Sequence, residues 1–348
     1  MHSVGMTSAL KSMWLRWLVN PDGVRTMTSE YRHIPVLLSE CLEYLHLESN
    51  YTFVDATLGG AGHSLEVAKR IGPTGTLIGI DQDDVARAAA TQRLQALPDD
   101  VRPEIKVLAG NFGEMDSLLV QAEIPAANGF LFDLGVSSVQ IDTPSRGFSF
   151  KEDGPLDMRM SPSTQTLTAA EIVNTYNAAD LTRIIRQYSD EKWASRIAEF
   201  IVEARQGQPL TTSSQLVDVI KAAVPASARR SGGHPAKRTF QALRIEVNGE
   251  LQVLRTGLES AIRWLAPGGY LAVISYHSLE DRIVKDMFKE YAQGCTCPPD
   301  LPVCVCGNKP ILKQITRKPI LPTPEEIARN PRSRSAKLRV AQRLDETA

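Results

Sequence analysis

Short apolar segments alternate along the chain with segments that have helical spacing or strong helix formers. Buried strands are predicted at five apolar segments: 51–54, 75–80, 105–109, 128–133 and 268–275. Helices are predicted at four neighbouring segments: 33–45, 65–71, 85–94 and 250–265. Pro35 stands near the start of the first of these helices, where proline is tolerated. This alternation predicts an α/β fold with a parallel sheet.

A long helical stretch interrupts the alternation between the fourth and fifth predicted strands. Helices are predicted within it at 168–176, 179–188, 191–205 and 213–223. We therefore expect an inserted helical, substrate-binding domain at 141–240, between the two parts of the main domain at 29–140 and 241–348. Residues 1–28 are expected to be a disordered extension outside the fold, with Met27 as the working start.

Composition and charge narrow the class of protein. Of 348 residues, 43% are hydrophobic, which is ample for a core, and the formal net charge is −1. Such a chain has no overall attraction to nucleic acid or acidic membranes, so any such partner must be held by local patches. No apolar run is long enough to cross a bilayer, and the N-terminal segment lacks a signal-peptide cleavage site. The cysteines do not form a secreted disulfide framework, so we expect a cytoplasmic enzyme with no membrane partner.

A glycine-rich turn joins the first predicted strand to the helix that follows it. Gly59, Gly60 and Gly62 permit a tight turn with a ligand against the backbone. Asp81 follows the next strand, about 20 residues on, where it is placed to hold a ribose diol. The spacing is not G-x-G-x-x-G, and Asp55 just before the turn would repel a pyrophosphate. The pattern favours the cationic, phosphate-free S-adenosylmethionine over NAD, with a turn that merely joins strand to helix as the alternative.

Residues suited to such a ligand stand at the ends of four successive predicted strands: Asp55, Asp81, Phe112 and Asp133. Because ligands of open parallel sheets bind beyond the carboxyl ends of the strands, we expect these side chains to meet at one edge. Phe112 is placed to cover an adenine ring, although a core aromatic would suit the same position.

Seven longer motifs occur in an order that resembles a known family. They are His33–Leu37 (HIPVL), Asp55–Ser64 (DATLGGAGHS), Asp133–Ser138 (DLGVSS), Arg146–Phe150 (RGFSF), Pro155–Met160 (PLDMRM), Phe240–Ile245 (FQALRI) and Ile274–Arg282 (ISYHSLEDR). From about residue 30 to the C-terminus the chain resembles the bacterial methyltransferases that modify N4 of a cytosine in 16S ribosomal RNA, the RsmH or MraW family. It departs from that pattern at Tyr276, where phenylalanine is usual, and at Lys237, where threonine is usual.

The resemblance implies a Rossmann-like, S-adenosylmethionine-dependent methyltransferase sheet with an inserted helical domain. It implies S-adenosylmethionine as the donor and 16S rRNA in the small ribosomal subunit as the substrate. It also implies a set of donor contacts: the backbone of Ala61, Gly62 and His63, with Asp81, Phe112, Asp133 and Gln140. Four of these positions also follow from the strand ends and the glycine turn.

Methyl transfer to the exocyclic amine of cytosine requires alignment of the nitrogen with the sulfonium methyl and an acceptor for a proton or hydrogen bond. Asp133 is the candidate acceptor, with a purely donor-binding role left open, and His277 is a weaker candidate. The chain lacks the polar-Pro-Pro-aromatic motif that many amino-methylating enzymes share. Phe148, Phe150 or Tyr276 would therefore have to stack the base.

Cations gather in two segments of this nearly neutral chain. The first contains Arg229, Arg230, His234, Lys237, Arg238 and Arg244, and the second contains Arg329, Arg332, Arg334, Lys337, Arg339 and Arg343. Such runs are often only solvated surface, but their concentration here favours phosphate contact with RNA. On the loop before the helical insertion, Asp157 and Arg159 either form a structural salt bridge or line the base pocket.

Four of the five cysteines form a paired C-x-C arrangement: Cys295, Cys297, Cys304 and Cys306. Four thiols can close a tetrahedral zinc site. The spacing is tighter than the usual C-x₂-C, and free or structural cysteines stay open as alternatives, so the pattern alone assigns no metal.

Two other classes of function are weighed against an RNA methyltransferase. A small-molecule methyltransferase would have little need of a large helical insertion or of two basic segments. A non-catalytic RNA-binding protein would not need the intact set of Asp55, Gly62, Asp81 and Asp133. Retention on heparin and donor binding by calorimetry separate these classes.

Overall fold

The computed structural model describes residues 17–19, 25–27, 35–229, 233–295, 297 and 306–345. The chain divides into two units, Met1–Ile34 and Pro35–Ala348. In the first unit, β1 (Trp17–Val19) pairs antiparallel with β2 (Arg25–Met27). The other residues of the expected N-terminal extension, and also Arg230 and Cys304, lie outside the described residues.

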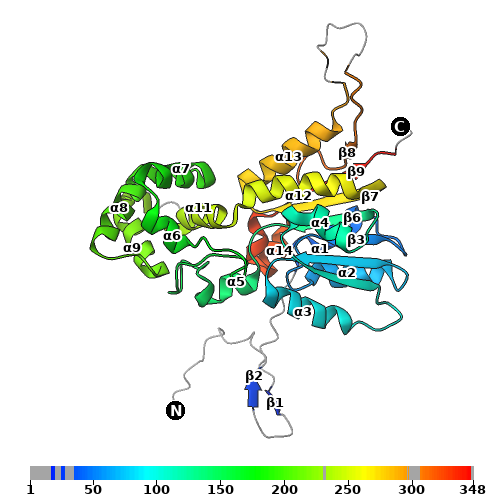
Figure 1. Cartoon of the computed structure of the whole chain (residues 1–348), viewed down its shortest axis with the longest axis horizontal. Coiled ribbons are helices and arrows are strands. Elements are labelled where there is room, and N and C mark those ends of the chain that lie inside the picture. The colour runs from blue at the N-terminus through cyan, green and yellow to red at the C-terminus, as the bar shows by residue number, and fades with distance from the viewer. Residues whose placement is uncertain are drawn as a thin grey trace, which may run out of the picture. The chain divides into compact units, whose positions relative to one another are not determined.

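Seven described strands of the second unit form one sheet in the order β5-β4-β3-β6-β7-β9-β8 (Figure 1). The parallel strands are β3 (Thr52–Asp55), β4 (Thr76–Asp81), β5 (Glu104–Ala109), β6 (Ala127–Asp133) and β7 (Leu265–Ser275). They confirm the five predicted strands, although β7 begins at Leu265 and not at Gly268. The order reverses between β3 and β6, which is where an open α/β sheet of the Rossmann type binds its ligand.

Helices cover both faces of this sheet because neighbouring strand residues point in opposite directions. The helices are α1 (Leu38–Tyr44), α2 (Gly62–Ile71), α3 (Asp84–Gln95), α4 (Met115–Gln121), α12 (Glu250–Trp264) and α13 (Ser278–Ala292). Phe53 packs in one buried cluster with Val67 and Ile71 of α2. The next residue, Val54, packs in the other cluster with Leu258 of α12.

The C-terminal segment adds two strands that the sequence pattern did not predict. β9 (Lys337–Arg343) pairs antiparallel with β7 and with β8 (Leu312–Gln314), after α14 (Pro324–Arg329) and the short helix η3 (Pro331–Ser335). Leu338 and Val340 are fully buried, and Arg339 is 6% exposed. The prediction of a basic tail is therefore wrong for residues 337–343, which form a strand inside the sheet.

The helical region carries a hydrophobic core of its own. Its elements are α5 (Ser138–Asp142), η2 (Pro144–Arg146), α6 (Ala169–Thr175), α7 (Ala178–Ser189), α8 (Ala194–Gly207), α9 (Ser213–Ala223), α10 (Ala226–Arg229) and α11 (Ala236–Asn248). The core runs from Phe148 to Val247 and includes Ile184 of α7 and Leu243 of α11. Figure 1 shows these helices grouped beside the sheet.

Side-chain caps explain where several of these helices begin. The side chains of Thr168, Asn177 and Thr212 accept backbone N–H groups at the starts of α6, α7 and α9. At the other end of the region, Gly249 takes φ 58° between α11 and α12, so one residue turns the chain from the helical region back to the sheet. Within the described residues, we find no helix with the length and hydropathy needed to cross a membrane.

Candidate active site

Residues 55–64, together with Asp81 and Asp83, make up the glycine-turn region. The backbone of Gly59 and Ala61 has φ of 49° and 58°, in the left-handed region. At Gly62 a Cβ atom would lie 2.7 Å from Cγ of Pro35. Pro35 therefore packs directly on the glycine turn, and a larger residue at Gly62 would push Pro35 away from the turn.

The carboxylate of Asp81, at the end of β4, closes this turn. Its Oδ2 accepts a hydrogen bond from the N–H of Gly59 at 2.8 Å, and its Oδ1 accepts one from the N–H of Asp83 at 2.8 Å. Burial raises the pKa of Asp81 to about 6, against the lowering effect of these two hydrogen bonds. Because both donors are backbone amides, the position of the carboxylate depends on the path of the chain.

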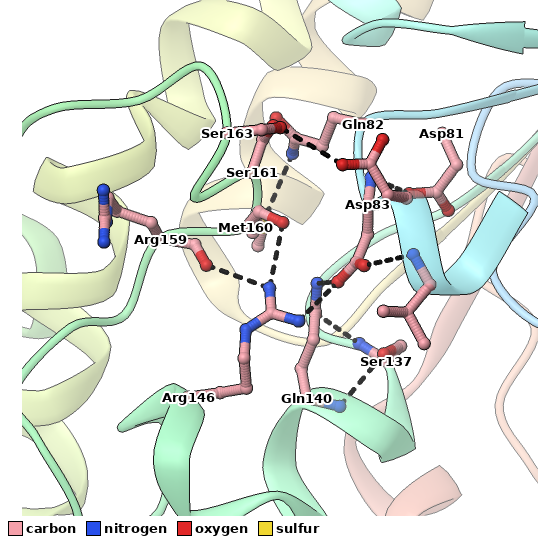
Figure 2. A network of polar contacts seen from close by, with 12 residues as sticks. Asp81, Gln82, Asp83, Ser137, Gln140, Arg146, Arg159, Met160, Ser161 and Ser163 are labelled. Atoms are coloured by element: carbon pink, nitrogen blue, oxygen red, sulfur yellow. Dashed lines mark hydrogen bonds and ion pairs between the residues drawn. The ribbon is translucent and has the colours of Figure 1, made fainter.

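Asp83 connects this region to the start of the helical region (Figure 2). Its Oδ1 accepts the N–H of Val85, which caps α3, at 3.0 Å. Its Oδ2 accepts hydrogen bonds from Nε2 of Gln140 at 3.0 Å and from Nη1 of Arg146 at 2.8 Å. Burial alone would raise the pKa of Asp83, but the hydrogen bonds from Arg146 and Gln140 outweigh it and hold the pKa below its usual range.

Arg146 also holds the loop that carries Arg159 and Met160. Its Nη2 donates to the carbonyl oxygens of these two residues at 3.1 and 3.0 Å (Figure 2). From α11, Asn248 accepts the N–H of Met160 on its Oδ1 at 2.9 Å. The loop is thus fixed between the end of β4 and the last helix of the helical region.

Two sequence-predicted residues are fully engaged in these structural contacts. Arg159 donates to both carboxylate oxygens of Asp157, from Nε at 2.9 Å and from Nη2 at 2.6 Å, as the salt-bridge alternative requires. Gln140 is buried, with its Oε1 accepting the N–H of Ser137 and its Nε2 bonded to Asp83. Direct contact of Gln140 with a donor stays a prediction.

Asp55 lies beneath the turn and not on its open side. It is 2% exposed, with the hydroxyl of Ser64 donating to Oδ2 at 2.6 Å and the N–H of Thr57 donating to Oδ1 at 3.1 Å. Burial raises the pKa of Asp55. The hydroxyl of Thr57 accepts the N–H of Asp133 at 2.6 Å. The expectation that Asp55 faces a ligand is wrong, because its carboxylate supports the turn from within.

Asp133, at the end of β6, is contacted by side chains from two other elements. The hydroxyl of Tyr276, just after β7, donates to its Oδ1 at 2.7 Å, and Nδ1 of His63 lies 3.7 Å from its Oδ2. His63 donates from Nε2 to the carbonyl of Val36 at 2.9 Å, because a carbonyl can only accept. Burial, together with the charge of Asp133, raises the pKa of Tyr276 well above its usual range, so the hydroxyl remains a donor.

A charged cluster lies next to Asp133 and Tyr276, and with them it makes up the acceptor region. Arg244 donates to both oxygens of Glu250 at 2.8 Å, and Nε2 of His277 lies 3.0 Å from Oε1 of Glu280. Oε2 of Glu280 accepts the N–H of Tyr276 and of His277 at 2.7 and 3.1 Å. Burial alone would raise the pKa of Glu280, but His277 and Arg244 hold it below its usual range.

The sequence analysis named Asp133, Tyr276 and His277 of the acceptor region, but it missed the roles of Glu250 and Glu280. The available signal was His277 three residues before Glu280, a spacing typical of a helix cap, and the structure has this capping box at the start of α13. Ligand atoms of Glu250, His277 and Glu280 converge within 4.8 Å, but both Glu250 oxygens bind Arg244, so the arrangement is a charge cluster and not an open metal site.

The aromatic candidates differ in their surroundings. Phe112 packs edge-on against Phe132 with ring centroids 5.5 Å apart, and a Cβ at Gly257 would lie 2.6 Å from its ring. Phe148 is buried in the helical core, and Phe150 stacks on His234 at 4.7 Å. Tyr276 is the stacking candidate in contact with Asp133. An adenine contact by Phe112 stays a prediction, and so does base stacking.

The two basic segments are used differently. In the first, Arg229, Lys237 and Arg238 are exposed, although Nη1 of Arg238 also lies 3.8 Å from Oε2 of Glu191, and Arg244 is paired with Glu250. In the second, Arg339 and Lys337 pair with Asp281 at 2.6 and 3.2 Å, Arg343 donates to backbone carbonyls such as that of Arg263, and Arg332 pairs with Asp142. Burial alone would raise the pKa of Asp281, but Arg339 and Lys337 hold it below its usual range. Several cations of the second segment thus neutralise aspartates of the same protein.

Known proteins resemble this chain over nearly its whole length. Residues 30–344 match the MraW methylase family. The ribosomal RNA small subunit methyltransferase H of Symbiobacterium thermophilum is 52% identical over 314 residues, which cover 90% of this chain and 97% of that protein. The protein of the same name from Ruminiclostridium cellulolyticum is 50% identical over 315 residues, which cover 90% of this chain and 100% of the relative.

A third relative, the ribosomal RNA small subunit methyltransferase H of Geobacter sulfurreducens, is 51% identical over 314 residues, covering 90% of this chain and 99% of that protein. A match of this extent includes the glycine turn, the helical region and the C-terminal strands together. The resemblance drawn from the seven motifs is therefore confirmed: this chain belongs to the MraW methylase family.

Proposed function

We propose that this protein transfers a methyl group from S-adenosylmethionine to the N4 amine of a cytosine in 16S rRNA of the small ribosomal subunit, and that it does so in the cytoplasm. The observation that carries the proposal is 52% identity, over 97% of its length, to a relative named for methylation of small-subunit ribosomal RNA. The glycine turn and the carboxylates of Asp81 and Asp133 supply the chemistry that such a reaction needs.

The glycine-turn region fits this donor. Each oxygen of Asp81 retains capacity for a further hydrogen bond, and two ribose hydroxyls match that capacity. The backbone at Ala61, Gly62 and His63 forms the start of α2, where partial positive charge suits the carboxylate of the donor. The acidic side chains at this edge disfavour a phosphate and suit an ammonium and a sulfonium. When bound, the donor supplies an electrophilic methyl group on sulfur.

Asp133 is the residue that we assign to the target amine. The hydroxyl of Tyr276 donates to one oxygen of its carboxylate at 2.7 Å, so that the orientation of the carboxylate is set before substrate arrives, and Nδ1 of His63 lies 3.7 Å from the other oxygen. As the amine gains positive charge in the transition state, its hydrogen bond to this carboxylate strengthens, which lowers the barrier and not only the binding energy. Asp133 then accepts the proton or holds the amine while water takes it.

Residues 141–240, which make up most of the helical region, are assigned to RNA binding, and residues 29–140 and 241–348 to methyl transfer, although α11 continues across the second boundary to Asn248. Arg229, Lys237 and Arg238 are exposed on this region. Further exposed cations lie on α7, on α8 and between these helices, outside the two basic segments of the sequence: Arg183, Arg186, Lys192 and Arg196. The bonds from Arg146 to Asp83 and to the Met160 carbonyl join this RNA-binding part to the donor side.

The proposal is tested with a labelled methyl donor. The protein is incubated with S-adenosylmethionine that carries an isotopically labelled methyl group, and with small subunits from a bacterial strain that lacks the homologous gene. Free 16S rRNA serves as a parallel substrate. Nucleosides from the digested RNA are separated by chromatography and identified by mass spectrometry. We expect the label in N4-methylcytidine.

Two measurements make the outcome decisive. The Asp133→Asn variant should bind the donor and transfer little label, whereas Asp99→Asn, an exposed aspartate in the turn after α3, should behave as the unaltered protein. Label at carbon 5 of cytosine, or no label in either RNA substrate while calorimetry detects donor binding, would contradict the proposal.

A further inference from the structure

A second cluster of reactive side chains lies away from the methyl-transfer site, between α13 and β8. The two elements pack side by side, and the segment between them is closed at its base by a hydrogen bond from the N–H of Ile311 to the carbonyl of Tyr291 at 2.8 Å. Just beyond, a Cβ at Gly294 would lie 3.3 Å from Cδ of Pro310. The two arms of the segment therefore run close together where the cysteines begin.

Three described thiols converge at this place. The sulfur atoms of Cys295, Cys297 and Cys306 all lie within 4.8 Å of one another, and those of Cys295 and Cys306 are 3.8 Å apart. With a zinc–sulfur distance of about 2.3 Å, a tetrahedral site places its sulfur atoms about 3.8 Å apart. A disulfide would require about 2.05 Å. The spacing of Cys295 and Cys306 suits two ligands of one ion.

A backbone amide also points at one of the sulfur atoms. The N–H of Cys297 donates to Sγ of Cys295 at 3.4 Å. Such a bond favours the thiolate, which is the form that binds metal. The tight C-x-C spacing, which counted against a metal in the sequence, is what places this amide two residues after its sulfur. An all-sulfur donor set of this kind selects zinc over magnesium or calcium.

We propose that Cys295, Cys297 and Cys306 bind a structural zinc ion that ties the end of α13 to the strand β8. The ion closes the segment as a cross-link would, with no part in methyl transfer. The sequence offers a further thiol, Cys304, outside the described residues, and cobalt spectroscopy distinguishes a fourth thiolate from water as the last ligand.

The test measures metal content in the full-length protein. The chain is purified with a reductant and without chelators, and zinc is quantified by inductively coupled plasma mass spectrometry. We expect about one zinc ion per chain. Cys295→Ser and Cys306→Ser should each lower the retained zinc about tenfold or more after dialysis against a weak chelator. Cys41→Ala, which removes the buried cysteine of α1, is the matched control and should keep the metal.

The number of thiolate ligands is determined from the absorption spectrum of the protein with Co²⁺ in place of zinc. Replacement of zinc by Co²⁺ should give an intense thiolate-to-metal charge-transfer band, which Cys304→Ser weakens if that residue is a ligand and leaves unchanged if water is. Either result supports the site. Zinc below one tenth per chain together with failure of the reduced protein to take up added Zn²⁺ would overturn it. In protein purified in parallel without the reductant, a chain mass lower by about 2 Da per disulfide would overturn it as well.

Discussion

The glycine-turn region and the acceptor region are each built around a carboxylate at the end of a strand, but they hold it by different means. Asp81 is held by the backbone amides of Gly59 and Asp83. Asp133 is contacted by the side chains of Tyr276 and His63, and its bond to Tyr276 joins residues 143 positions apart. Only substitution by proline deletes a backbone donor, whereas a change of Tyr276 to any residue without a hydroxyl removes the group that holds Asp133. The first region should therefore tolerate changes around its carboxylate, and the second should not.

The largest effect is expected from Asp133→Asn, which keeps the shape and an acceptor oxygen for Tyr276 but removes the charge. We expect the single-turnover rate at saturating donor to fall by on the order of 10²-fold or more, about 2.7 kcal/mol. If Asp133 only orients the donor, the rate at saturation would instead return to near its original value while the donor Kd rises. That result would move the acceptor role elsewhere.

A smaller effect is expected from Asp81→Ala in the glycine-turn region. Loss of a charge-assisted hydrogen bond to the ribose should cost roughly 1.5–3 kcal/mol, or about 10- to 150-fold in donor Kd by titration calorimetry. The neighbouring control is Asp84→Ala, an exposed aspartate at the start of α3, which should leave the Kd within about twofold. Equal effects of both variants would show that Asp81 has no specific contact.

The raised pKa of Asp81 predicts that donor affinity depends on pH, and this effect is the next largest that we expect. Because burial raises that pKa to about 6, the carboxylate that we assign to the ribose hydroxyls becomes protonated as the pH falls below 6. The donor Kd should rise about tenfold per pH unit below that value. The stability of the protein without donor should depend on pH in the opposite direction. The folded state binds the proton of Asp81 more tightly than the unfolded state does, so the contribution of Asp81 to the free energy of unfolding decreases as the pH rises from about 4 through 6. Asp81→Asn should abolish both dependences.

The comparison is sharpened by Tyr276→Phe, which removes the hydroxyl that holds Asp133 and keeps the aromatic ring. We expect a fall in single-turnover rate of about 2- to 10-fold, the value of one net hydrogen bond of about 0.5–1.5 kcal/mol. Tyr270→Phe on β7, whose ring packs on His46, is the control. An unchanged rate would mean that Asp133 does not depend on this side chain for its orientation.

The smallest effect per residue is expected from the exposed cations. Changing Lys237 and Arg238 to alanine should weaken binding of RNA and flatten its salt dependence by about 0.7–0.9 for each phosphate group that the variant no longer binds, with no change in donor Kd. The matched control is the exposed pair Lys69 and Arg70 on α2. A wild-type salt slope in the double variant would make these residues solvated surface. Arg339 does not belong to this group, because its pairing with Asp281 is part of the fold.

The glycine-turn region could be predicted because the residues that contact one another there are close together in the sequence. Asp81 lies 22 residues from Gly59, within one strand-turn-helix-strand unit whose pattern is local. Asp133, Tyr276 and His277 were also singled out from the sequence, but the bond between Asp133 and Tyr276 was not predicted, because it depends on two strands being neighbours in space. The prediction for Asp55 was wrong for a related reason. Its carboxylate was expected to face a ligand because it stands at a strand end, but it is buried and accepts a hydrogen bond from the hydroxyl of Ser64.

The strand β9 was missed because charge obscured its alternation. In Lys337–Arg343 the buried Leu338 and Val340 alternate with polar residues, as in any half-buried strand. Arg339 breaks the expected pattern because it is buried, and its charge is compensated by Asp281, 58 residues earlier. A count of cations cannot separate a surface patch from such an internal pair.

The place of β9 also has a consequence for synthesis of the protein. A chain leaves the ribosome from its N-terminus, so the earlier strands are available to fold while later ones are still being made. β7 lies between β6 and β9, and β9 begins 62 residues after β7 ends. Until those residues have been made, β7 keeps an open edge, which is a site for pairing with other chains. The sheet is therefore completed only when residues 337–343 have left the ribosome.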